Sequence, residues 1–305
     1  MAAASPEESL APRSPQPAAG VWQLRGRALA LDHPVILGIL NVTPDSFSDG
    51  GAFFSPDSAI EHAARMFDDG ADIVDIGGES TRPQGAVPVE APEEVRRVLP
   101  VVRVLRQRYP DCLISVDTVK SEVAEAVLDA GADIINDVSA FRLDARMARV
   151  CAAHAAGVIL MHSRGGVHDM ATYTHAAYGA DVVGEVIHEL GESAQAAERA
   201  GIARQAIALD PGIGFAKRSE HSIAVLAQLE RLVALGYPVV VGVSRKRVVG
   251  ELSGVSAPAE RVEGTTGANV MALAAGARIF RVHDVRAARR ALDVAWAIEH
   301  DRITV

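Results

Sequence analysis

Four polar residues, each placed just after a short apolar run, are suited to binding a flat, nitrogen-rich ring. Asp117, Asn136 and Asp210 end three of these runs, and Lys246 follows a fourth. Carboxylates accept hydrogen bonds, an amide both donates and accepts, and an ammonium donates to a ring oxygen or nitrogen. The set predicts a pocket for a heterocycle with adjacent N–H donors, such as a pterin or a purine. Any one Asp or Asn could instead cap the following helix, but three such ends together with a lysine favour a ligand.

A second group of residues combines arginine with smaller hydrogen-bonding side chains and is suited to binding an anion. The first, second and last of the apolar runs are flanked by Asn41, Thr81, Arg82, Arg281 and His283. The guanidinium fork of arginine matches phosphate oxygens, and in an extended segment Arg281 and His283 fall on the same side. The pattern predicts a phosphate site, with a surface network of ion pairs as the alternative.

Magnesium is the metal that residues of this region could hold. No cluster of His, Cys and carboxylate residues has the spacing of a zinc site. Mg²⁺ prefers one or two protein oxygens together with substrate phosphates, and Asn41, Asp45 and Asp49 could supply them. Asn and Asp are also common turn formers near proline and glycine, and the residues by themselves leave both interpretations open.

The segment Asp210-Pro-Gly-Ile-Gly-Phe215 combines two glycines with an aromatic side chain. Glycine lets the backbone approach a ligand closely, and Phe215 is available to stack on a ring. Pro-Gly also marks ordinary turns, so the segment supports the ring pocket without defining it.

Eight apolar runs supply the frame that must position these residues. The runs begin near Val35, Ile73, Leu113, Ile134, Val158, Ile207, Val239 and Ile279. Continuous apolar runs are typical of strands buried on both faces. Polar groups at the C-terminal ends of such strands are where an α/β barrel carries its chemistry.

The segments between the runs have helical spacing. Gly70, Gly131 and Gly276 each open a near-identical tetrapeptide before a strand, as expected of glycines that end helices. Further helices are expected over residues 181–200, 220–235, 266–275 and 285–300, and Pro100 should kink or split its helix. Alternating strands and helices predict a parallel sheet. Without a Gly-rich dinucleotide fingerprint, eight strands favour a single-domain (β/α)8 TIM barrel over residues 21–305, rather than an open doubly wound sheet.

Composition narrows the classes of function. The 305 residues are 49% hydrophobic, enough for a barrel of about 250 residues. A net charge of −9 argues against a nucleic-acid-binding surface, and no apolar stretch is long enough to span a membrane. Cys112 and Cys151 have no metal or redox spacing and fit small buried residues in a reducing compartment. Residues 1–20 resemble a disordered tail rather than a signal peptide, so we expect a soluble cytoplasmic protein.

A series of motifs resembles the dihydropteroate synthase family and occurs in the order of that family. The motifs are Asn41-Val-Thr-Pro-Asp-Ser-Phe-Ser-Asp-Gly50, Gly78-Glu-Ser-Thr-Arg-Pro83, Ser115-Val-Asp-Thr118, Ile135-Asn-Asp137, Asp210-Pro-Gly-Ile-Gly-Phe215, Ser244-Arg-Lys246 and Arg281-Val-His-Asp284. The first two are highly specific. The resemblance implies a (β/α)8 barrel, usually a homodimer. It also implies condensation of 6-hydroxymethyl-7,8-dihydropterin diphosphate with p-aminobenzoate, giving 7,8-dihydropteroate and pyrophosphate.

The resemblance also implies roles for particular residues. The pterin would be held by Asp117, Asn136, Asp210 and Lys246. Independently of the resemblance, Phe215 and Met161 are placed to pack against its ring. The diphosphate would be held by Asn41, Arg82, Arg281 and His283, with Mg²⁺ near Asn41. The first two loops would close over p-aminobenzoate, and they carry Asp45, Phe47, Asp49, Thr81, Arg82 and Pro83. Ser244 would contact the p-aminobenzoate carboxylate. The residues expected to take part in catalysis are Asp45, Asp49, Arg82 and Lys246.

Three departures from the family pattern leave these ligands in place. Gln84 follows Pro83 where the family continues to glycine, the segment after His162 follows the pattern loosely, and Ala216 stands where glycine is common. Two alternative functions share the pterin pocket. A pterin-dependent methyltransferase domain needs no diphosphate site, which the Arg281-Val-His motif argues against. An inactive paralogue that only binds pterin is disfavoured by the intact loop and lysine motifs.

Overall fold

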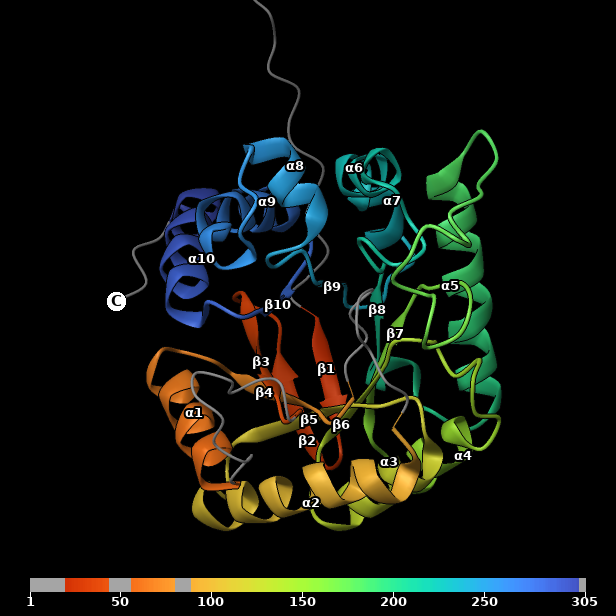
Figure 1. Ribbon diagram of the computed structural model, residues 1–305, viewed down its shortest axis with the longest axis vertical. Coiled ribbons are helices and arrows are strands. Elements are labelled where there is room, and N and C mark those ends of the chain that lie inside the picture. Colours follow the sequence, from red (N-terminus) through yellow and green to blue (C-terminus); the bar gives the residue numbers. More distant parts are fainter. Residues whose placement is uncertain (1–19, 44–55, 80–88, 302–305) are drawn as a thin grey trace, which may run out of the picture.

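Eight parallel strands form a barrel in the computed structural model, which describes residues 20–43, 56–79 and 89–301 (Figure 1). The strands are β3 (Val35–Asn41), β4 (Ile73–Gly77), β5 (Leu113–Asp117), β6 (Ile134–Asp137), β7 (Gly157–Met161), β8 (Ile207–Asp210), β9 (Val240–Val241) and β10 (Ile279–Val282). Their order in the sheet is β8-β7-β6-β5-β4-β3-β10-β9. A parallel bridge between Leu209 and Val239 brings the two edges together. The predicted (β/α)8 barrel is confirmed.

Helices surround the strands (Figure 1). They are α1 (Pro56–Asp68), α2 (Ala91–Arg108), α3 (Ser121–Asp129), α4 (Met147–Ala153), α5 (Val182–Arg199), α6 (Ser219–Ala227), α7 (Leu229–Val233), α8 (Arg247–Ser253), α9 (Val262–Ala274) and α10 (Val285–His300), with short 3-10 turns at Arg204–Ala206 and Pro258–Glu260. The prediction of α10 is confirmed to the residue. The single helix expected over 220–235 was wrong, because Gln228 leaves the helical region (φ −124°, ψ 31°) and separates α6 from α7. Pro100 lies inside α2 without splitting it.

The repeated glycines end helices as predicted. Gly70, Gly131 and Gly276 have φ angles of 99°, 103° and 100°, respectively. This backbone conformation is strained for residues with a Cβ atom. Each glycine therefore turns the chain from a helix on the outside of the barrel into the next strand.

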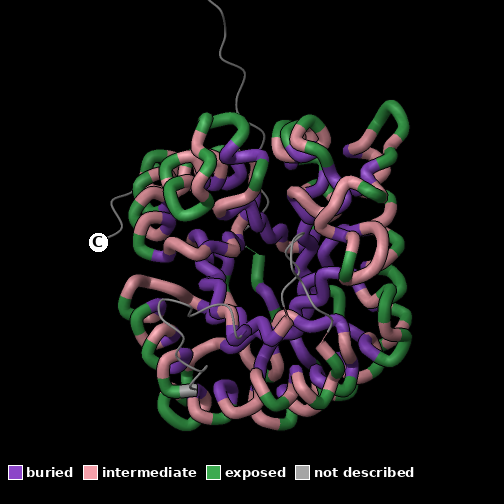
Figure 2. Tube along the Cα trace, viewed as in Figure 1, coloured by how far each residue is buried: buried purple, intermediate pink, exposed green. Residues whose placement is uncertain are grey.

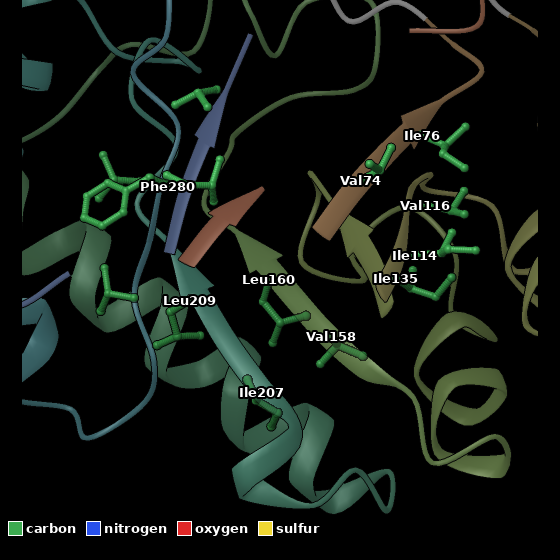
Figure 3. Packing of buried hydrophobic residues seen from close by; sticks show 14 of the residues in the cluster. Val74, Ile76, Ile114, Val116, Ile135, Val158, Leu160, Ile207, Leu209 and Phe280 are labelled. Carbon is green, nitrogen blue, oxygen red and sulfur yellow. The ribbon is translucent and has the colours of Figure 1, made fainter. Parts of the chain in front are cut away.

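Side chains of the strands alternate between the two faces of the barrel wall, as the pleat requires. The outward-facing side chains pack with the helices into one large core, and Figure 3 shows several of them pointing away from the strands. The lower inward-facing side chains form a second apolar cluster, which includes Leu37, Ile73, Ile134, Ile159 and Ile279. Buried residues accordingly concentrate in the centre of the molecule (Figure 2).

An antiparallel hairpin covers the end of the barrel where the strands begin. Its strands are β1 (Val21–Leu24) and β2 (Arg27–Ala30). Trp22 and Leu24 are fully buried in the inner apolar cluster, and Trp22 Nε1 donates to the carbonyl of Ala206 at 2.9 Å. A Cβ on Gly157 would stand 2.3 Å from Leu24 Cδ2, so this glycine makes room for the hairpin. The hairpin was not among the strands predicted from the apolar runs, and burial alternates along β1.

The predictions about membrane spans and cysteines can be compared with the part of the chain that the structure describes. No helix within the described ranges is long and apolar enough to cross a membrane. Cys112 and Cys151 are both free, and Cys151 is buried. The cytoplasmic location stays a prediction, and the tail, apart from Gly20, lies outside the described residues.

Replacing Trp22 with alanine should test the contribution of the hairpin. The Trp22→Ala variant loses a fully buried ring and leaves the Ala206 carbonyl without its donor, so we expect a loss of about 3–5 kcal/mol in the free energy of unfolding. Urea unfolding followed by circular dichroism measures this. The control, Val21→Ala at an exposed neighbour, should change stability by less than about 0.5 kcal/mol. Equal effects of the two substitutions would show that the hairpin does not seal the core.

Candidate active site

The strand register aligns two of the predicted ring-binding residues, Asp117 and Asn136, with Asn41 at the ends of neighbouring strands. Gly77 of β4 pairs with Asn41 of β3 on one side and with Asp117 of β5 on the other. Asp117 in turn pairs with Asn136 of β6. Because the strands are parallel, these positions share the C-terminal end of the barrel, which we call the mouth. The predicted convergence of these strand ends is confirmed.

Arg281 of β10 lies between two carboxylates at the mouth. Its Nε is 2.7 Å from Asp75 Oδ2, and its Nη2 is 2.8 Å from Asp117 Oδ2. Burial by itself would lower the pKa of Arg281, but the two carboxylates raise it, so the guanidinium stays charged. The predicted phosphate-binding arginine is therefore held in place by charges of the protein before any anion binds.

Asp75 is the residue of this site that the sequence analysis missed. It is fully buried in the middle of β4 and accepts hydrogen bonds from Ser115 Oγ at 2.6 Å and Asn136 Nδ2 at 3.1 Å, in addition to Arg281. The available signal was a carboxylate inside the apolar run Ile73-Val-Asp-Ile-Gly77. A buried charge at such a position requires a partner.

The surroundings of Asp117 shift its pKa upward. Burial raises the pKa of this carboxyl to about 7, while Arg281 opposes the rise and Asp75 adds to it. Ligand N–H groups that hydrogen-bond to the carboxylate would favour its ionised form. The site therefore accommodates a donor-rich ring edge at Asp117 near neutral pH.

Asp210 and Lys246 both lie close to Gly242, on the other side of the mouth. The position of a Cβ on Gly242 lies 3.6 Å from Asp210 Oδ2 and 3.9 Å from Lys246 Nζ. Burial lowers the pKa of Lys246 to about 8, and the Asp210 carboxylate opposes that change. The Lys246 ammonium lies 4.5 Å from the centroid of the Phe215 ring and donates to the carbonyl of Ile213.

The mouth has one polar side and one apolar side. Small residues form part of its floor, because a Cβ on Gly77 would stand 3.7 Å from Asn41 Oδ1 and 3.8 Å from Asp117 Cβ. Its apolar wall is a cluster of Val119, Val138, Met161 and Met170, with Val167 and Phe215 packed against it. Hydrogen-bonding groups beside an apolar wall suit a flat heterocycle.

Ser244 and His283 form a pair beyond β9 and β10. Ser244 Oγ accepts from the backbone N–H of His283 at 3.1 Å and lies 3.0 Å from its Nδ1. Arg281 instead contacts residues of β4 and β5. The two residues of the Arg-Val-His motif therefore contact different neighbours, one at the centre of the mouth and one at its rim.

The two predicted closing loops lie largely outside the described residues. This applies to all of their named candidates: Asp45, Phe47, Asp49, Thr81, Arg82, Pro83 and Gln84. The described base of the second loop is held by Glu79, which accepts from the backbone N–H of Val89 at 2.9 Å and pairs with Lys120 at 2.6 Å.

The Mg²⁺ site stays a prediction because, of its candidate ligands Asn41, Asp45 and Asp49, only Asn41 lies in the described part of the chain. Within residues 20–43, 56–79 and 89–301, no three His, Cys, Asp or Glu residues are arranged to hold a metal ion. Asn41 presents its amide oxygen near Gly77, at the end of β3. One protein oxygen completed by substrate phosphates is a usual arrangement for Mg²⁺.

A parallel barrel with this mouth is typical of one class, the pterin-binding enzymes. The family described as pterin binding enzyme matches residues 37–283 of the chain. A dihydropteroate synthase of Streptococcus pyogenes serotype M3 is 45% identical over 263 residues, which cover 86% of this chain and 94% of that protein. The dihydropteroate synthase of Xanthomonas albilineans has been solved with 4-aminobenzoic acid. That structure is 44% identical, with a TM-score of 0.85, and the match covers 92% of this chain and 99% of that one.

The same Xanthomonas albilineans enzyme in complex with 7,8-dihydropteroate matches with a TM-score of 0.82 and 42% identity, over 92% of this chain and 98% of that one. The chain described here belongs to the dihydropteroate synthase family, a family of transferases, as its motifs predicted.

Replacing Asp75 should destabilise the protein much more than removing a single hydrogen bond to it. In the Asp75→Ala variant, Arg281 loses one of its two carboxylates and Asn136 loses an acceptor, so we expect about 3–5 kcal/mol less stability. The matched variant Ser115→Ala removes one bond to the same carboxylate and should cost about 1 kcal/mol. Denaturant unfolding of both proteins measures the difference. Similar losses in the two variants would contradict a central role for Asp75.

Proposed function

We propose that the mouth binds 6-hydroxymethyl-7,8-dihydropterin diphosphate and joins its pterin-methyl group to the amine of p-aminobenzoate, releasing pyrophosphate. The observation that carries the proposal is Arg281, which donates to the ring-binding carboxylate Asp117 and lies on β10, beside the strand that ends at Asn41 and two residues before His283. A single guanidinium thereby connects a ring pocket with an anion site. The Xanthomonas albilineans relative, solved with an aminobenzoate and with a dihydropteroate, supports the same assignment.

The polar side of the mouth matches the edges of a pterin. The ring carries N–H donors on its pyrimidine edge, and the carboxylates of Asp117 and Asp210 can accept hydrogen bonds from them. Asn136 both donates and accepts, and the Lys246 ammonium can donate to a ring oxygen or nitrogen. Met161 and Phe215 offer apolar surface to the ring faces.

The anion side of the mouth would hold the leaving group. Arg281 has N–H groups beyond the two that meet Asp75 and Asp117, and these can bind diphosphate oxygens. We place His283, Thr81 and Arg82 around the same diphosphate. Mg²⁺, held by the amide oxygen of Asn41 and by the diphosphate, would neutralise part of its charge when bound.

The proposed reaction is a substitution at the methylene carbon of the pterin. The bond between this carbon and the diphosphate oxygen breaks, and its electron pair leaves with pyrophosphate. The amine nitrogen of p-aminobenzoate forms the new bond and then loses a proton. Arg281 and Arg82 stabilise the leaving anion, and Asp45 and Asp49 stabilise positive charge on the methylene. Closure of the first two loops would exclude water, which competes with the weak amine nucleophile.

Both alternatives lack a use for the anion side. A pterin-dependent methyltransferase domain binds no diphosphate, whereas Arg281 and His283 stand at the end of β10, next to the ring pocket. An inactive pterin binder would need the ring-binding residues but not the diphosphate ligands, which this chain retains. Tight binding of methyltetrahydrofolate without binding of the pterin diphosphate would favour the methyltransferase.

Turnover by the purified protein tests the proposal. Pyrophosphate should be released only when the pterin diphosphate, p-aminobenzoate and Mg²⁺ are all present. Asp117→Asn removes a charged acceptor for the ring, so kcat/KM should fall by about 10- to 100-fold. The matched control Asp111→Asn changes an exposed aspartate before β5 and should keep wild-type activity. No turnover by the wild-type protein, or full activity of Asp117→Asn, would overturn the assignment.

We also propose that the protein is a homodimer and that α8, α9 and α10 contribute to its interface. These three helices carry four of the large apolar side chains exposed in the described residues: Leu252, Met271, Val294 and Ile298, with exposed fractions of 70%, 71%, 61% and 77%. The helices pack against one another in sequence, α8 on α9 and α9 on α10. Exposed apolar side chains on neighbouring elements are typical of a surface that another protein covers.

Sedimentation of a charged variant should test this interface. Met271→Asp places a carboxylate in the proposed contact, and burying it there is unfavourable, so the variant should sediment as a monomer while the wild-type protein sediments as a dimer. The matched control Val21→Asp alters an exposed residue of the terminal hairpin and should leave the dimer intact. A monomeric wild-type protein, or an unchanged Met271→Asp dimer, would refute this arrangement.

A further inference from the structure

A buried lysine outside the proposed mechanism holds the loop that follows β8. Lys217 is 1% exposed, and its Nζ lies 2.7 Å from His162 Nδ1. The same atom lies 3.2 Å from the carbonyl oxygens of both Gly212 and Phe215. A lysine is rarely buried this deeply unless its ammonium has partners. Here the partners are the end of β7 and two peptide groups of one short loop.

The hydrogen-bond partners of His162 indicate how the ammonium is satisfied. His162 Nε2 lies 3.1 Å from the Glu189 carboxylate of α5, which only accepts hydrogen bonds, so Nε2 carries the proton. Burial lowers the pKa of His162 to about 4, so the ring is neutral and Nδ1 is an acceptor. Lys217 thus points its N–H groups at three close acceptors, with the carbonyl of His162 as a fourth, longer contact at 3.5 Å. Burial lowers the pKa of Lys217 well below its usual value, and the Asp210 carboxylate opposes that change. The three close acceptors favour the ammonium, because a neutral amine has only two N–H donors for them.

Residues 210–217 form a loop that cannot easily change shape around this contact. A Cβ on Gly212 would stand 1.9 Å from the carbonyl oxygen of His162, so the loop presses directly on the end of β7. Gly212 and Gly214 have φ angles of 64° and 78°. The Ala216 N–H donates to the carbonyl of Met170 at 2.6 Å.

The same loop reaches the mouth through other groups. The carbonyl of Ile213 accepts from Lys246, and the ring of Phe215 lies beneath the Lys246 ammonium. Lys217 binds the carbonyls of Gly212 and Phe215, on either side of Ile213. Two lysines therefore bind one loop at different carbonyls, one from the mouth and one from the buried side.

We propose that Lys217 is a positioning residue of the pterin site. Its ammonium contacts His162, whose ring is oriented by Glu189, and fixes the 210–217 loop so that Phe215, the Ile213 carbonyl and Lys246 stand ready at the mouth. The proposal deepens the proposed function and rests on it for the identity of the ligand. The proposal also gives His162 a role. This residue follows β7 and faces away from the mouth, toward α5 and Lys217. The buried cation additionally opposes the rise that burial causes in the pKa of Asp210.

Two measurements on Lys217→Met test the proposal. Methionine keeps most of the side-chain volume but removes all three donors. Hydrogen exchange of the 210–217 amides should become at least about tenfold faster, because the loop loses its buried anchor. Calorimetric titration with 6-hydroxymethyl-7,8-dihydropterin diphosphate and Mg²⁺ should give a Kd about tenfold or more above that of the wild-type protein. Unchanged exchange, or a Kd within twofold of wild type, would overturn the proposal.

Controls separate positioning from general loss of stability. Cys151→Ala opens a small cavity in the buried face of α4, away from the loop. It should lower the melting temperature without changing the Kd or the exchange of residues 210–217. A Kd that rises equally in Cys151→Ala would mean that Lys217 acts only on stability.

A second pair of variants covers the case in which Lys217→Met does not fold. Glu189→Ala removes the partner of His162 Nε2 from the half-exposed surface of α5, and should weaken pterin diphosphate binding about threefold. Glu192→Ala, one turn further along α5 and exposed, should leave the Kd unchanged. Equal Kd values for these two variants would count against the anchor. Failure of the wild-type protein to bind the pterin diphosphate would refute the proposed function. Hydrogen exchange of the 210–217 amides would still show whether Lys217 fixes the loop.

Discussion

The pairing of Arg281 with Asp75 and Asp117 is the interaction on which the rest of the mouth depends. Removing charges from water costs several kcal/mol for each group unless they are paired and hydrogen-bonded. Here the guanidinium meets both carboxylates, and Ser115 and Asn136 supply further hydrogen bonds to Asp75. The charges come from β10, β4 and β5, so they meet only when β10 has taken its place beside β3. Assembly of the barrel and assembly of the site are therefore the same event.

The interior of the barrel has an apolar layer near the strand starts and a polar layer near the mouth. Near the strand starts, inward side chains are apolar and are covered by Trp22 and Leu24 of the hairpin. Two residues further along β4, β5 and β6, the inward positions become polar, at Asp75, Ser115 and Asn136. The apolar layer needs no partner beyond packing, and it supports the polar layer, whose groups satisfy one another. Beyond that layer, glycines at the mouth leave space for a ligand, and the buried Lys217 fixes the loop at its edge.

Sequence patterns located most of the elements, because strand and helix periodicities are local properties. They also located Asp117, Asn136, Asp210 and Lys246, because the carboxyl ends of parallel strands must share one end of a barrel. They missed Asp75, since a single carboxylate inside an apolar run has no visible partner until the sheet closes. They missed the roles of His162 and Lys217 for a related reason: the two residues are 55 positions apart and touch beneath a loop. The break between α6 and α7 at Gln228 has no clear sequence signal.

The sequence by itself determined the fold class, the family and the strand ends that carry polar groups, because each of these is encoded in short stretches of residue types. The tertiary structure alone decided which charges pair, which lysine faces the mouth and which is buried. Arg281 and Asp75 are separated by 206 positions, and nothing in either neighbourhood specifies the other. Their contact follows from sheet order and register, which bring the last strand of the barrel beside the first and set its arginine among carboxylates of the next two strands.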